Sequence, residues 1–337
     1  MEESKKIKLA INGFGRIGRA ACKVALEHDE IELVAINDLG EMANLAYLLC
    51  YDSVYGRYSR AIKVEEDGLV VGDKKIKVYG EAEPKKLPWD NLGVDVVIES
   101  TGVFNDKAGA AGHIEAGAKK VIISAPTKDE SIPTIVLGVN DEEMAGNDII
   151  SNASCTTNSA APVVKVINEL FGIKKAMLTT VHAYTATQGL VDGPAKNDWR
   201  RGRAAGINIT PSSTGAAVAA TLAYPKIKGK FDGVALRVPV AVVSISDFVM
   251  LLKKKVTVED INAAFEDVAD KGGDKGVLGV TSEPVASSDF IGDPRSAIID
   301  LAMTRVVDGD LVKVMAWYDN EWGYANRLIE QVILLGK

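Results

Sequence analysis

A cysteine at the expected start of a helix is the strongest candidate for chemistry in this sequence. Residues 151–158 read SNASCTTN and lead into an apolar, helix-patterned run at residues 160–171, which places Cys155 near the helix N-terminus. Exposed backbone N–H groups and the positive end of the helix dipole favour anions there, so the pKa of the thiol is expected to fall. A small buried cysteine is the commoner role for this residue type. The polar flanks favour a nucleophilic thiolate instead.

A histidine and an arginine are candidates to complete such a site. His182 is one of three histidines and follows a predicted strand that could place it opposite Cys155. A neutral imidazole in that position would act as a base. Arg237 lies inside an apolar strand pattern, so it requires an anionic partner if it is buried. That partner would be a substrate phosphate or, alternatively, a structural carboxylate.

A glycine-rich segment near the N-terminus predicts a dinucleotide site. An apolar strand at residues 8–12 ends in the loop GFGRIG at residues 13–18, and a helical pattern follows at residues 19–27. A second apolar strand at residues 31–37 ends at Asp38, twenty residues beyond the loop. This order and spacing are typical of the first βαβ unit of a dinucleotide-binding fold.

Each glycine of this loop has a physical role in that interpretation. Gly13 gives the tight turn, Gly15 lets the backbone approach a pyrophosphate, and Gly18 lets helix and strand pack closely. Asp38 can accept hydrogen bonds from ribose hydroxyls, and the adjoining residues Leu39 and Gly40 offer no cation for a 2′-phosphate. We therefore expect NAD as the cofactor and a preference for it over NADP. An ordinary glycine-rich turn would leave Asp38 unexplained.

The surrounding pattern predicts two domains. Strands at residues 95–99, 119–124 and 149–151, with a helix at 106–116 and an antiparallel insertion at 62–79, continue the alternation of strand and helix. We expect an α/β fold, with a Rossmann-type doubly wound NAD-binding domain at residues 1–154 and a helix at about 321–337 packing back on it.

The second half has a different pattern. Long strands at residues 174–185, 233–239, 242–253 and 311–317 and an amphipathic helix at 258–270 predict an α+β catalytic domain at residues 155–320 with a large mixed or antiparallel sheet. The long loop at residues 186–209 carries Arg200, Arg201 and Arg203. Such a loop is uncommon unless functional. One or two of these arginines could bind a phosphate or a neighbouring subunit, although a solvated face is the commoner role.

Bulk properties restrict the class of protein. A length of 337 residues fits two domains, and the formal charge of −7 argues against general binding of nucleic acid or anionic membranes. We expect neither a signal peptide nor a membrane span, and a cytoplasmic location. Cys22, Cys50 and Cys155 are too few and too scattered for a disulfide framework or a zinc site, so no metal is expected.

Six motifs in order resemble those of the phosphorylating glyceraldehyde-3-phosphate dehydrogenase family. They are NGFGRIGR (12–19), SNASCTTN (151–158), TTVHAYTATQ (179–188), STGAA (213–217), LRVP (236–239) and WYDNEWGY (317–324). The resemblance covers nearly the whole chain. It implies an NAD-dependent oxidative phosphorylation of D-glyceraldehyde 3-phosphate to 1,3-bisphosphoglycerate in glycolysis or gluconeogenesis, carried out by a homotetramer.

The resemblance also assigns roles to individual residues. It implies that Cys155 is the nucleophile and His182 its base. For the cofactor, it implies contacts from Arg16 and Ile17 to the phosphates, from Asp38 to the adenine ribose, and from Ser124 and Asn320 to the nicotinamide half. For the substrate phosphate, it implies Thr185 and Arg237. For the attacking inorganic phosphate, it implies Ser154, Thr156, Thr214 and Gly215, with Arg201 nearby.

Two alternative functions remain open at this stage. One is a sibling dehydrogenase acting on erythrose 4-phosphate, against which Thr185 and the intact STGAA segment argue by the same resemblance. The other is a thiol redox sensor or binding protein that keeps only the fold. Ser159 stands where many family members have a second cysteine, which weakens a redox-sensor interpretation.

Overall fold

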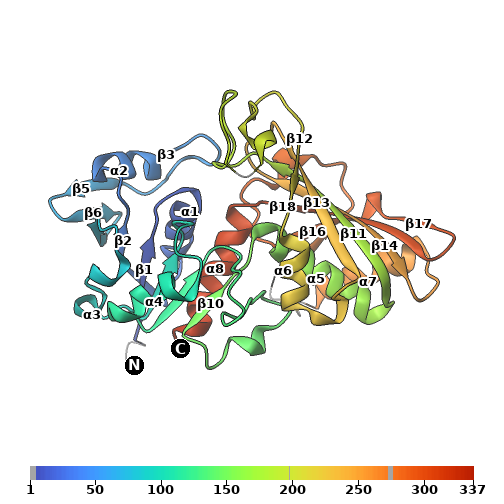
Figure 1. Cartoon of the computed structure of the whole chain (residues 1–337), viewed down its shortest axis with the longest axis horizontal. Coiled ribbons are helices and arrows are strands. Elements are labelled where there is room, and N and C mark those ends of the chain that lie inside the picture. Colours follow the sequence, from blue (N-terminus) through green and yellow to red (C-terminus); the bar gives the residue numbers. More distant parts are fainter. Residues whose placement is uncertain (1–4, 197, 272–275) are drawn as a thin grey trace. The chain divides into compact units, whose positions relative to one another are not determined.

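The computed structural model describes residues 5–196, 198–271 and 276–337. Residues 1–4, residue 197 of the predicted long loop and residues 272–275 lie outside the described residues. The chain divides into two compact units, drawn in Figure 1. Unit 1 comprises Met1–Ile135, Glu142–Ala153 and Ala325–Lys337, and unit 2 comprises Val136–Asp141 and Ser154–Tyr324.

Unit 1 is built on one twisted sheet. Its strands are β1 (Ile7–Asn12), β2 (Ile31–Asn37), β5 (Ile62–Glu65), β6 (Gly68–Val71), β7 (Lys74–Tyr79), β8 (Val96–Glu99), β9 (Lys120–Ile123) and β10 (Ile149–Ser151). The order is β10-β9-β8-β1-β2-β7-β6-β5, and every neighbouring pair from β10 to β7 is parallel. The chain therefore moves outward on both sides of β1, and a doubly wound sheet of this kind binds ligands beyond the carboxyl ends of its central strands.

The helices of unit 1 connect these strands. They are α1 (Arg16–Ala25), α2 (Met42–Cys50), α3 (Trp89–Leu92) and α4 (Lys107–Glu115), and the greater part of α8 (Trp322–Leu335) joins them. A two-stranded ribbon, β3 (Tyr51–Asp52) and β4 (Gly56–Arg57), follows α2. The predicted terminal helix returns to unit 1, where Gln331 donates to the carbonyl of Ile135 and Lys337 pairs with Glu30.

The predicted antiparallel insertion is only partly separate from this sheet. Strands β5, β6 and β7 form antiparallel pairs, as the turns at Gly68 and Gly72 predict. However, β7 also pairs in parallel with β2, with Asn37 opposite Tyr79. The segment therefore extends the main sheet beyond β2, which a local pattern of short strands could not indicate.

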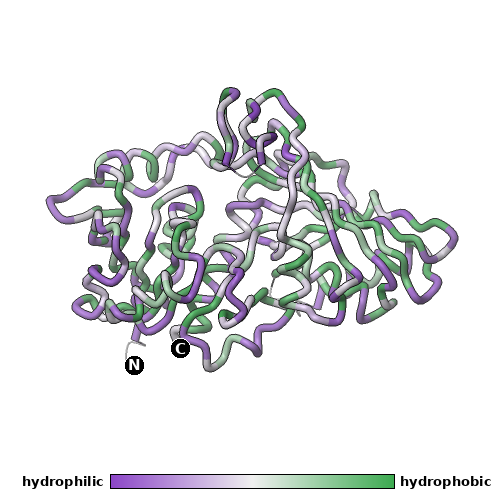
Figure 2. Tube along the Cα trace, viewed as in Figure 1, coloured by the Kyte–Doolittle hydropathy of each residue, from purple (hydrophilic) through white to green (hydrophobic). Residues whose placement is uncertain are grey.

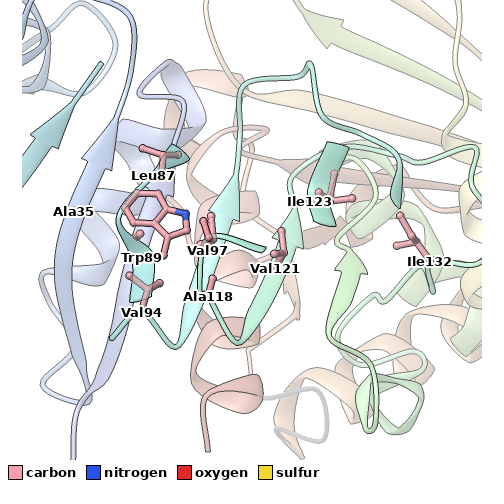
Figure 3. Close-up of a cluster of buried hydrophobic side chains, with 12 residues drawn as sticks. Ala35, Leu87, Trp89, Val94, Val97, Ala118, Val121, Ile123 and Ile132 are labelled. Atoms are coloured by element: carbon pink, nitrogen blue, oxygen red, sulfur yellow. The ribbon is translucent and has the colours of Figure 1, made fainter. Parts of the chain in front are cut away.

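The core of unit 1 lies against the parallel strands. Figure 3 shows Trp89 beside Val94 and Val97, with Val121 on the adjoining strand. All four side chains are fully buried. Parallel strands are covered on both faces, which explains the continuous apolar runs of β8 and β9.

A polar network is buried in the same unit. The indole N–H of Trp89 donates to Nδ1 of His113 (3.0 Å), and Nε2 of His113 lies 3.0 Å from the carboxylate of Glu99. Asn12 at the end of β1 also donates to Glu99. Because an indole is a donor only, Nδ1 must accept, and the proton of His113 resides on Nε2. The network therefore satisfies a buried carboxylate beneath the glycine loop.

Unit 2 contains a second, mixed sheet covered by helices. Its strands are β11 (Ile173–Ala183), β12 (Thr210–Ser213), β13 (Phe231–Val238), β14 (Ser244–Leu252), β15 (Leu278–Thr281), β16 (Ala297–Asp300), β17 (Arg305–Val307) and β18 (Leu311–Tyr318). Their order is β12-β13-β11-β14-β18-β16-β15, with β17 beside β18. Helices α5 (Cys155–Leu170), α6 (Ala216–Ala223) and α7 (Val258–Asp270) pack with this sheet.

Local sequence explains several of these elements. Along β18, Val312, Val314, Ala316 and Tyr318 are buried while the residues between them are more exposed, the alternation that gives a sheet one covered face. Figure 2 shows hydrophobic and hydrophilic residues interspersed along the chain of both units. Helix α7 begins after Thr257, whose hydroxyl accepts from the N–H of Asp260 while the Asp260 carboxylate accepts in return. Such a capping box fixes a helix start.

The predicted fold class agrees with these two sheets. Among the described residues, no helix has both the length and the apolar character needed to cross a membrane.

The glycine loop after β1 gives a test of the packing. A Cβ at Gly18 would lie 2.0 Å from the carbonyl oxygen of Gly13, whereas a Cβ at Gly15 would have no atom within 4 Å. We expect Gly18→Ala to lower the free energy of unfolding by about 1–3 kcal/mol, as overpacking does. Gly15→Ala is the matched control and should leave it within about 0.5 kcal/mol. Urea unfolding measures both, and equal losses would contradict this account.

Candidate active site

Cys155 is the first residue of α5, where the sequence predicts it. The preceding Ser154 is the N-cap, and its hydroxyl accepts from the N–H of Thr157 at 3.1 Å. A serine in this position ends the extended segment and fixes where the helix begins. Cys155 is half-buried, with its backbone in the first turn of the helix.

The pKa of Cys155 differs from the expectation. Burial raises the pKa of the thiol, while Arg237 and hydrogen bonds from Thr156 act in the opposite direction without outweighing it. The prediction of a lowered pKa was therefore wrong, because it considered the helix terminus and not the loss of hydration on burial of the thiol. A thiol in this state needs a nearby proton acceptor before it can attack.

His182 provides a nitrogen in the right place. It lies near the end of β11, is 2% exposed, and its Nε2 is 3.5 Å from Sγ of Cys155. Burial, reinforced by the charge of Arg237, lowers the pKa of His182 to about 3. The imidazole is therefore neutral at physiological pH and has a lone pair for a proton.

Arg237 is held next to His182 by strand register. Strands β11 and β13 are parallel, and His182 is paired with Arg237 in that register. Nη1 of Arg237 lies 2.6 Å from Nδ1 of His182 and donates to the carbonyl of Ala183 at 3.1 Å. Among the ion pairs of the described residues, none joins Arg237 to a carboxylate. The described residues therefore do not support the alternative in which Arg237 pairs with a structural carboxylate.

A second arginine lies close to Arg237. Burial lowers the pKa of the Arg237 guanidinium, and the charge of Arg201 lowers it further. Arg201 is oriented by Ser212, whose hydroxyl accepts from its Nε (2.9 Å) and Nη2 (2.7 Å). Two nearby guanidinium groups repel each other, so an anion between them would be stabilised.

The other arginines of the loop have different roles. Arg200 pairs with Asp198, which also caps the short turn Trp199–Gly202, and Arg203 pairs with Asp192. Both arginine side chains are largely exposed, so these pairs contribute little to stability. Of the three arginines in the loop, Arg201 is the one that the structure turns towards the β12 edge of the sheet.

The remaining residues expected at the phosphates also belong to unit 2. Thr185 follows β11, and its hydroxyl lies 3.0 Å from that of Thr187. Thr214 precedes α6, with its hydroxyl accepting from the N–H of Ala216, and Gly215 is the N-cap of that helix. Thr156 instead directs its buried hydroxyl to Tyr318, at 3.0 Å.

Tyr318 is a residue of this site that the sequence analysis did not single out. Its hydroxyl also lies 2.7 Å from that of Thr180 on β11, and its ring meets the His182 ring edge-on with centroids 6.0 Å apart. It joins β18, β11 and α5 in one buried network. The only sequence signal was its presence in the WYDNEWGY motif.

The glycine loop of unit 1 has the geometry of a dinucleotide cradle. Gly13 has a φ of +92°, and a Cβ there would lie 2.6 Å from the backbone nitrogen of Thr101. Gly15, by contrast, leaves open space and places no side chain at the start of α1. A bare helix N-terminus with an open approach fits a pyrophosphate.

Asp38 lies against this loop. Its Oδ2 accepts from the N–H of Phe14 at 2.7 Å, and Oδ1 accepts from Gly40 at 2.8 Å. Each carboxylate oxygen can accept a further hydrogen bond, so ribose hydroxyls remain suitable partners. The carboxylate also fixes the loop, a second role that spacing alone did not reveal.

The other residues expected at the cofactor are divided between the units. Arg16 and Ile17 are in the first turn of α1, and the guanidinium of Arg16 pairs with Asp52 at 2.8 Å. Ser124 directly follows β9 in unit 1. Asn320 belongs to unit 2, where its buried amide oxygen accepts from Ser244 at 3.0 Å.

Comparison with known families decides the assignment. Residues 7–107 match the model of the glyceraldehyde 3-phosphate dehydrogenase NAD binding domain, and residues 154–320 match that of the C-terminal domain of the same family. The chain belongs to the glyceraldehyde 3-phosphate dehydrogenase family. Like the family, it is an NAD-dependent dehydrogenase with a Rossmann domain and a C-terminal catalytic domain, which confirms the predicted cofactor and fold class.

Curated members of the glyceraldehyde 3-phosphate dehydrogenase family resemble the chain along its whole length. The glyceraldehyde-3-phosphate dehydrogenase of Streptomyces coelicolor is 52% identical over 333 residues, 98% of each chain. That of Mycolicibacterium smegmatis is 53% identical over 340 residues, covering 98% of this chain and 99% of the relative. Glyceraldehyde-3-phosphate dehydrogenase 1 of Bacillus subtilis is 51% identical over 333 residues, 98% of each.

The neutral histidine makes stability depend on pH. The pKa of His182 is about 3 in the folded chain against 6.5 for a free side chain, so between these values the unfolded chain binds a proton that the folded chain does not. The contribution of His182 is therefore present above about pH 6.5 and is lost as the pH falls towards 3. Urea midpoints measured across this range should fall less steeply with decreasing pH in His182→Asn than in the parent. Parallel curves would contradict the burial of a neutral imidazole.

Proposed function

We propose that this protein oxidises and phosphorylates D-glyceraldehyde 3-phosphate to 1,3-bisphosphoglycerate, using Cys155 as nucleophile and His182 as base. The observation that carries the proposal is the 3.5 Å approach of the Cys155 sulfur to the His182 imidazole, beside an arginine without a carboxylate partner among the described ion pairs. The decisive test is formation of NADH, followed by absorbance, from aldehyde and inorganic phosphate, with NADP in parallel.

The chemistry divides between the two side chains. His182 Nε2 takes the thiol proton, the Cys155 sulfur attacks the aldehyde carbon, and the imidazolium returns the proton to the carbonyl oxygen to give a thiohemiacetal. His182 then removes the hydroxyl proton as the carbon–hydrogen electron pair departs with its hydrogen. NAD, when bound, supplies the nicotinamide that accepts this hydride. The product is a thioester on Cys155, which inorganic phosphate cleaves to release the acyl phosphate and the thiolate.

Two phosphate sites are proposed in unit 2. Arg237 and Thr185 would hold the phosphate of the aldehyde, since Arg237 is close to His182 and Thr185 follows the same strand. Arg201 would help hold the attacking phosphate, together with the polar groups of Ser154, Thr156, Thr214 and Gly215. The hydroxyls of Ser154 and Thr156 already bond to Thr157 and Tyr318, so their contribution would come from remaining acceptor or donor capacity.

The cofactor contacts are proposed from the same reasoning. The loop of Gly13, Gly15 and Gly18 would receive the pyrophosphate at the start of α1, with the backbone of Arg16 and Ile17, and Asp38 would accept from the adenine ribose. Ser124 and Asn320 would contact the nicotinamide half. In this proposal residues 1–154 with the terminal helix form the NAD-binding domain and residues 155–320 the catalytic domain.

Two further properties are proposed from family membership. Assembly as a homotetramer and a cytoplasmic location fit enzymes of this family, and sedimentation of the purified protein tests the first. The erythrose 4-phosphate alternative is less favoured, because the relatives are named for glyceraldehyde 3-phosphate. A redox protein without catalysis would have no need of a neutral base beside the thiol.

Replacement of the nucleophile gives a direct prediction. Cys155→Ser should keep the fold and NAD binding but lose dehydrogenase activity by several orders of magnitude, because a hydroxyl is far less acidic than a thiol. Cys50→Ser is the matched control and should retain turnover. Iodoacetamide should inactivate through Cys155, because His182 is placed to accept the proton of this thiol, whereas burial raises the pKa of Cys22 to about 12. Inactivation with the label on Cys22 or Cys50 would refute the assignment.

Substrate discrimination tests the role of Arg237. Arg237→Ala should raise the KM for glyceraldehyde 3-phosphate by about ten- to a hundredfold, since a hydrogen bond to a charged group contributes about 1.5–3 kcal/mol. The KM for unphosphorylated glyceraldehyde should change little. Arg203→Ala, which removes an exposed arginine of the neighbouring loop, should leave both constants unchanged. Equal effects of Arg237→Ala on the two aldehydes would show that Arg237 is structural.

A further inference from the structure

The side-chain amide of Asn320 is hydrogen-bonded on only one of its two sides among the described residues. Its oxygen, Oδ1, accepts from the hydroxyl of Ser244 at 3.0 Å. No hydrogen bond in the described part of the chain uses its nitrogen, Nδ2, although Asn320 is only 5% exposed. Nδ2 is also not one of the fully enclosed polar atoms that lack a partner, so this nitrogen reaches the surface. Within the described residues, a nearly buried side chain thus keeps two N–H donors for an outside partner.

The hydrogens available at Ser244 fix this orientation of the amide. The N–H of Ala183 donates to the serine oxygen at 3.1 Å, and a backbone N–H can only donate. The single hydroxyl hydrogen therefore remains for Asn320, which must offer its oxygen to accept it. With the amide turned over, two N–H groups would point at the serine oxygen. The hydroxyl hydrogen would then have no acceptor among the described hydrogen bonds of Ser244, which is unfavourable for a buried group.

The backbone is fixed on both sides of this contact. Ser244 is 2% exposed and is the first residue of β14. The preceding Val243 has a φ of +69°, a conformation that is rare for a β-branched residue and persists only where the surroundings impose it. On the other side, the carboxylate of Asp319, next to Asn320, accepts from the N–H of Trp322 at 2.8 Å and holds the turn between β18 and α8. The serine hydroxyl is therefore held in place to orient the amide.

Two N–H donors at the surface favour a ligand that offers a hydrogen-bond acceptor. The nicotinamide ring of NAD carries a carboxamide, which has a carbonyl oxygen on one side and an N–H2 group on the other. An asparagine that presented Oδ1 would bind the N–H2 group of this carboxamide, whereas one that presents Nδ2 binds the carbonyl oxygen. The orientation that Ser244 gives to Asn320 therefore selects the carbonyl side of the carboxamide.

We propose that Ser244 is a positioning residue for the cofactor, because its hydroxyl holds the amide of Asn320 with Nδ2 outward to receive the carbonyl oxygen of the nicotinamide carboxamide. The proposal rests on the contact of Asn320 with the nicotinamide half proposed above and adds to it the residue that orients the amide. Ser244 also bonds to Ala183, the last residue of β11. One hydroxyl thus joins the cofactor contact to the strand that carries the proposed base. A restrained carboxamide in turn restrains the ring that accepts the hydride.

A double-mutant cycle on NAD binding, measured by calorimetry, tests the role of Ser244. Ser244→Ala should raise the dissociation constant of NAD by about two- to tenfold, the contribution of one neutral hydrogen bond, because the amide is then free to turn. In an Asn320→Ala background, which itself weakens binding, the same change should have no further effect. Equal effects of Ser244→Ala in the two backgrounds would show a purely structural role and overturn the proposal.

Ser246 provides the matched control for this cycle. It is buried on the same strand as Ser244, two residues further on, and its hydroxyl has no hydrogen-bond partner among the described residues. Ser246→Ala therefore removes the same atom from the same strand without touching Asn320. It should leave the dissociation constant of NAD unchanged, and a loss as large as that of Ser244→Ala would also overturn the proposal.

The 3-acetylpyridine analogue of NAD tests which atom of the amide faces the cofactor, and it needs no change at Ser244. The analogue keeps the carbonyl oxygen but has a methyl group in place of the carboxamide nitrogen. The ratio of its dissociation constant to that of NAD should be the same in the parent and in Asn320→Ala. A ratio that is about twofold or more larger in the parent would show that Oδ1 faces the cofactor, which overturns the proposal.

The outcomes separate this proposal from the proposed function. An unchanged dissociation constant of NAD in Asn320→Ala overturns the contact of Asn320 and the positioning by Ser244 with it, while formation of NADH still supports the proposed reaction. Conversely, a parent that binds NAD and follows the cycle but forms no NADH from aldehyde and phosphate overturns the proposed reaction and leaves the positioning role of Ser244 intact.

Discussion

The parallel register of β11 and β13 is the constraint on which the catalytic unit depends, because it sets the neighbours of a buried imidazole. Strand register places His182 beside Arg237, and helix α5 brings Cys155 to the other ring nitrogen. Burial keeps the thiol protonated and the imidazole uncharged, so neither side chain is reactive by itself. Reactivity requires a proton transfer between them, for which the sulfur and Nε2 lie 3.5 Å apart.

Rigid elements hold these groups in place. Strand β11 lies between β13 and β14 in the sheet, and Tyr318 from β18 bonds to Thr180 of β11 and Thr156 of α5. The two elements that carry the nucleophile and the base are therefore joined through the same buried hydroxyl. Buried polar networks with every member satisfied rigidify their surroundings. The approach of the sulfur to the imidazole is thus supported by residues far apart in the sequence.

Local patterns predicted the features that depend on a few consecutive residues. Ser154 caps α5 where the sequence indicated a helix start, and Asp38 directly follows β2 at the expected spacing from the glycine loop. Helix α2 was missed because MANLAYLLC is apolar almost throughout and shows no clear period. The pKa of Cys155 could not be predicted because it depends on burial by distant segments. The neighbour of Arg237 could not be predicted because it lies 55 residues away in the sequence, on a paired strand. A local sequence pattern does not show which distant strands pair.

Two histidines of this chain are buried, and each has at Nδ1 a neighbour that can only donate. For His113 that neighbour is the uncharged indole of Trp89, packed in the core of unit 1. For His182 it is the guanidinium of Arg237, which joins no carboxylate among the described ion pairs. An uncharged donor only completes the core of unit 1, whereas the charged donor of unit 2 can still bind an anion.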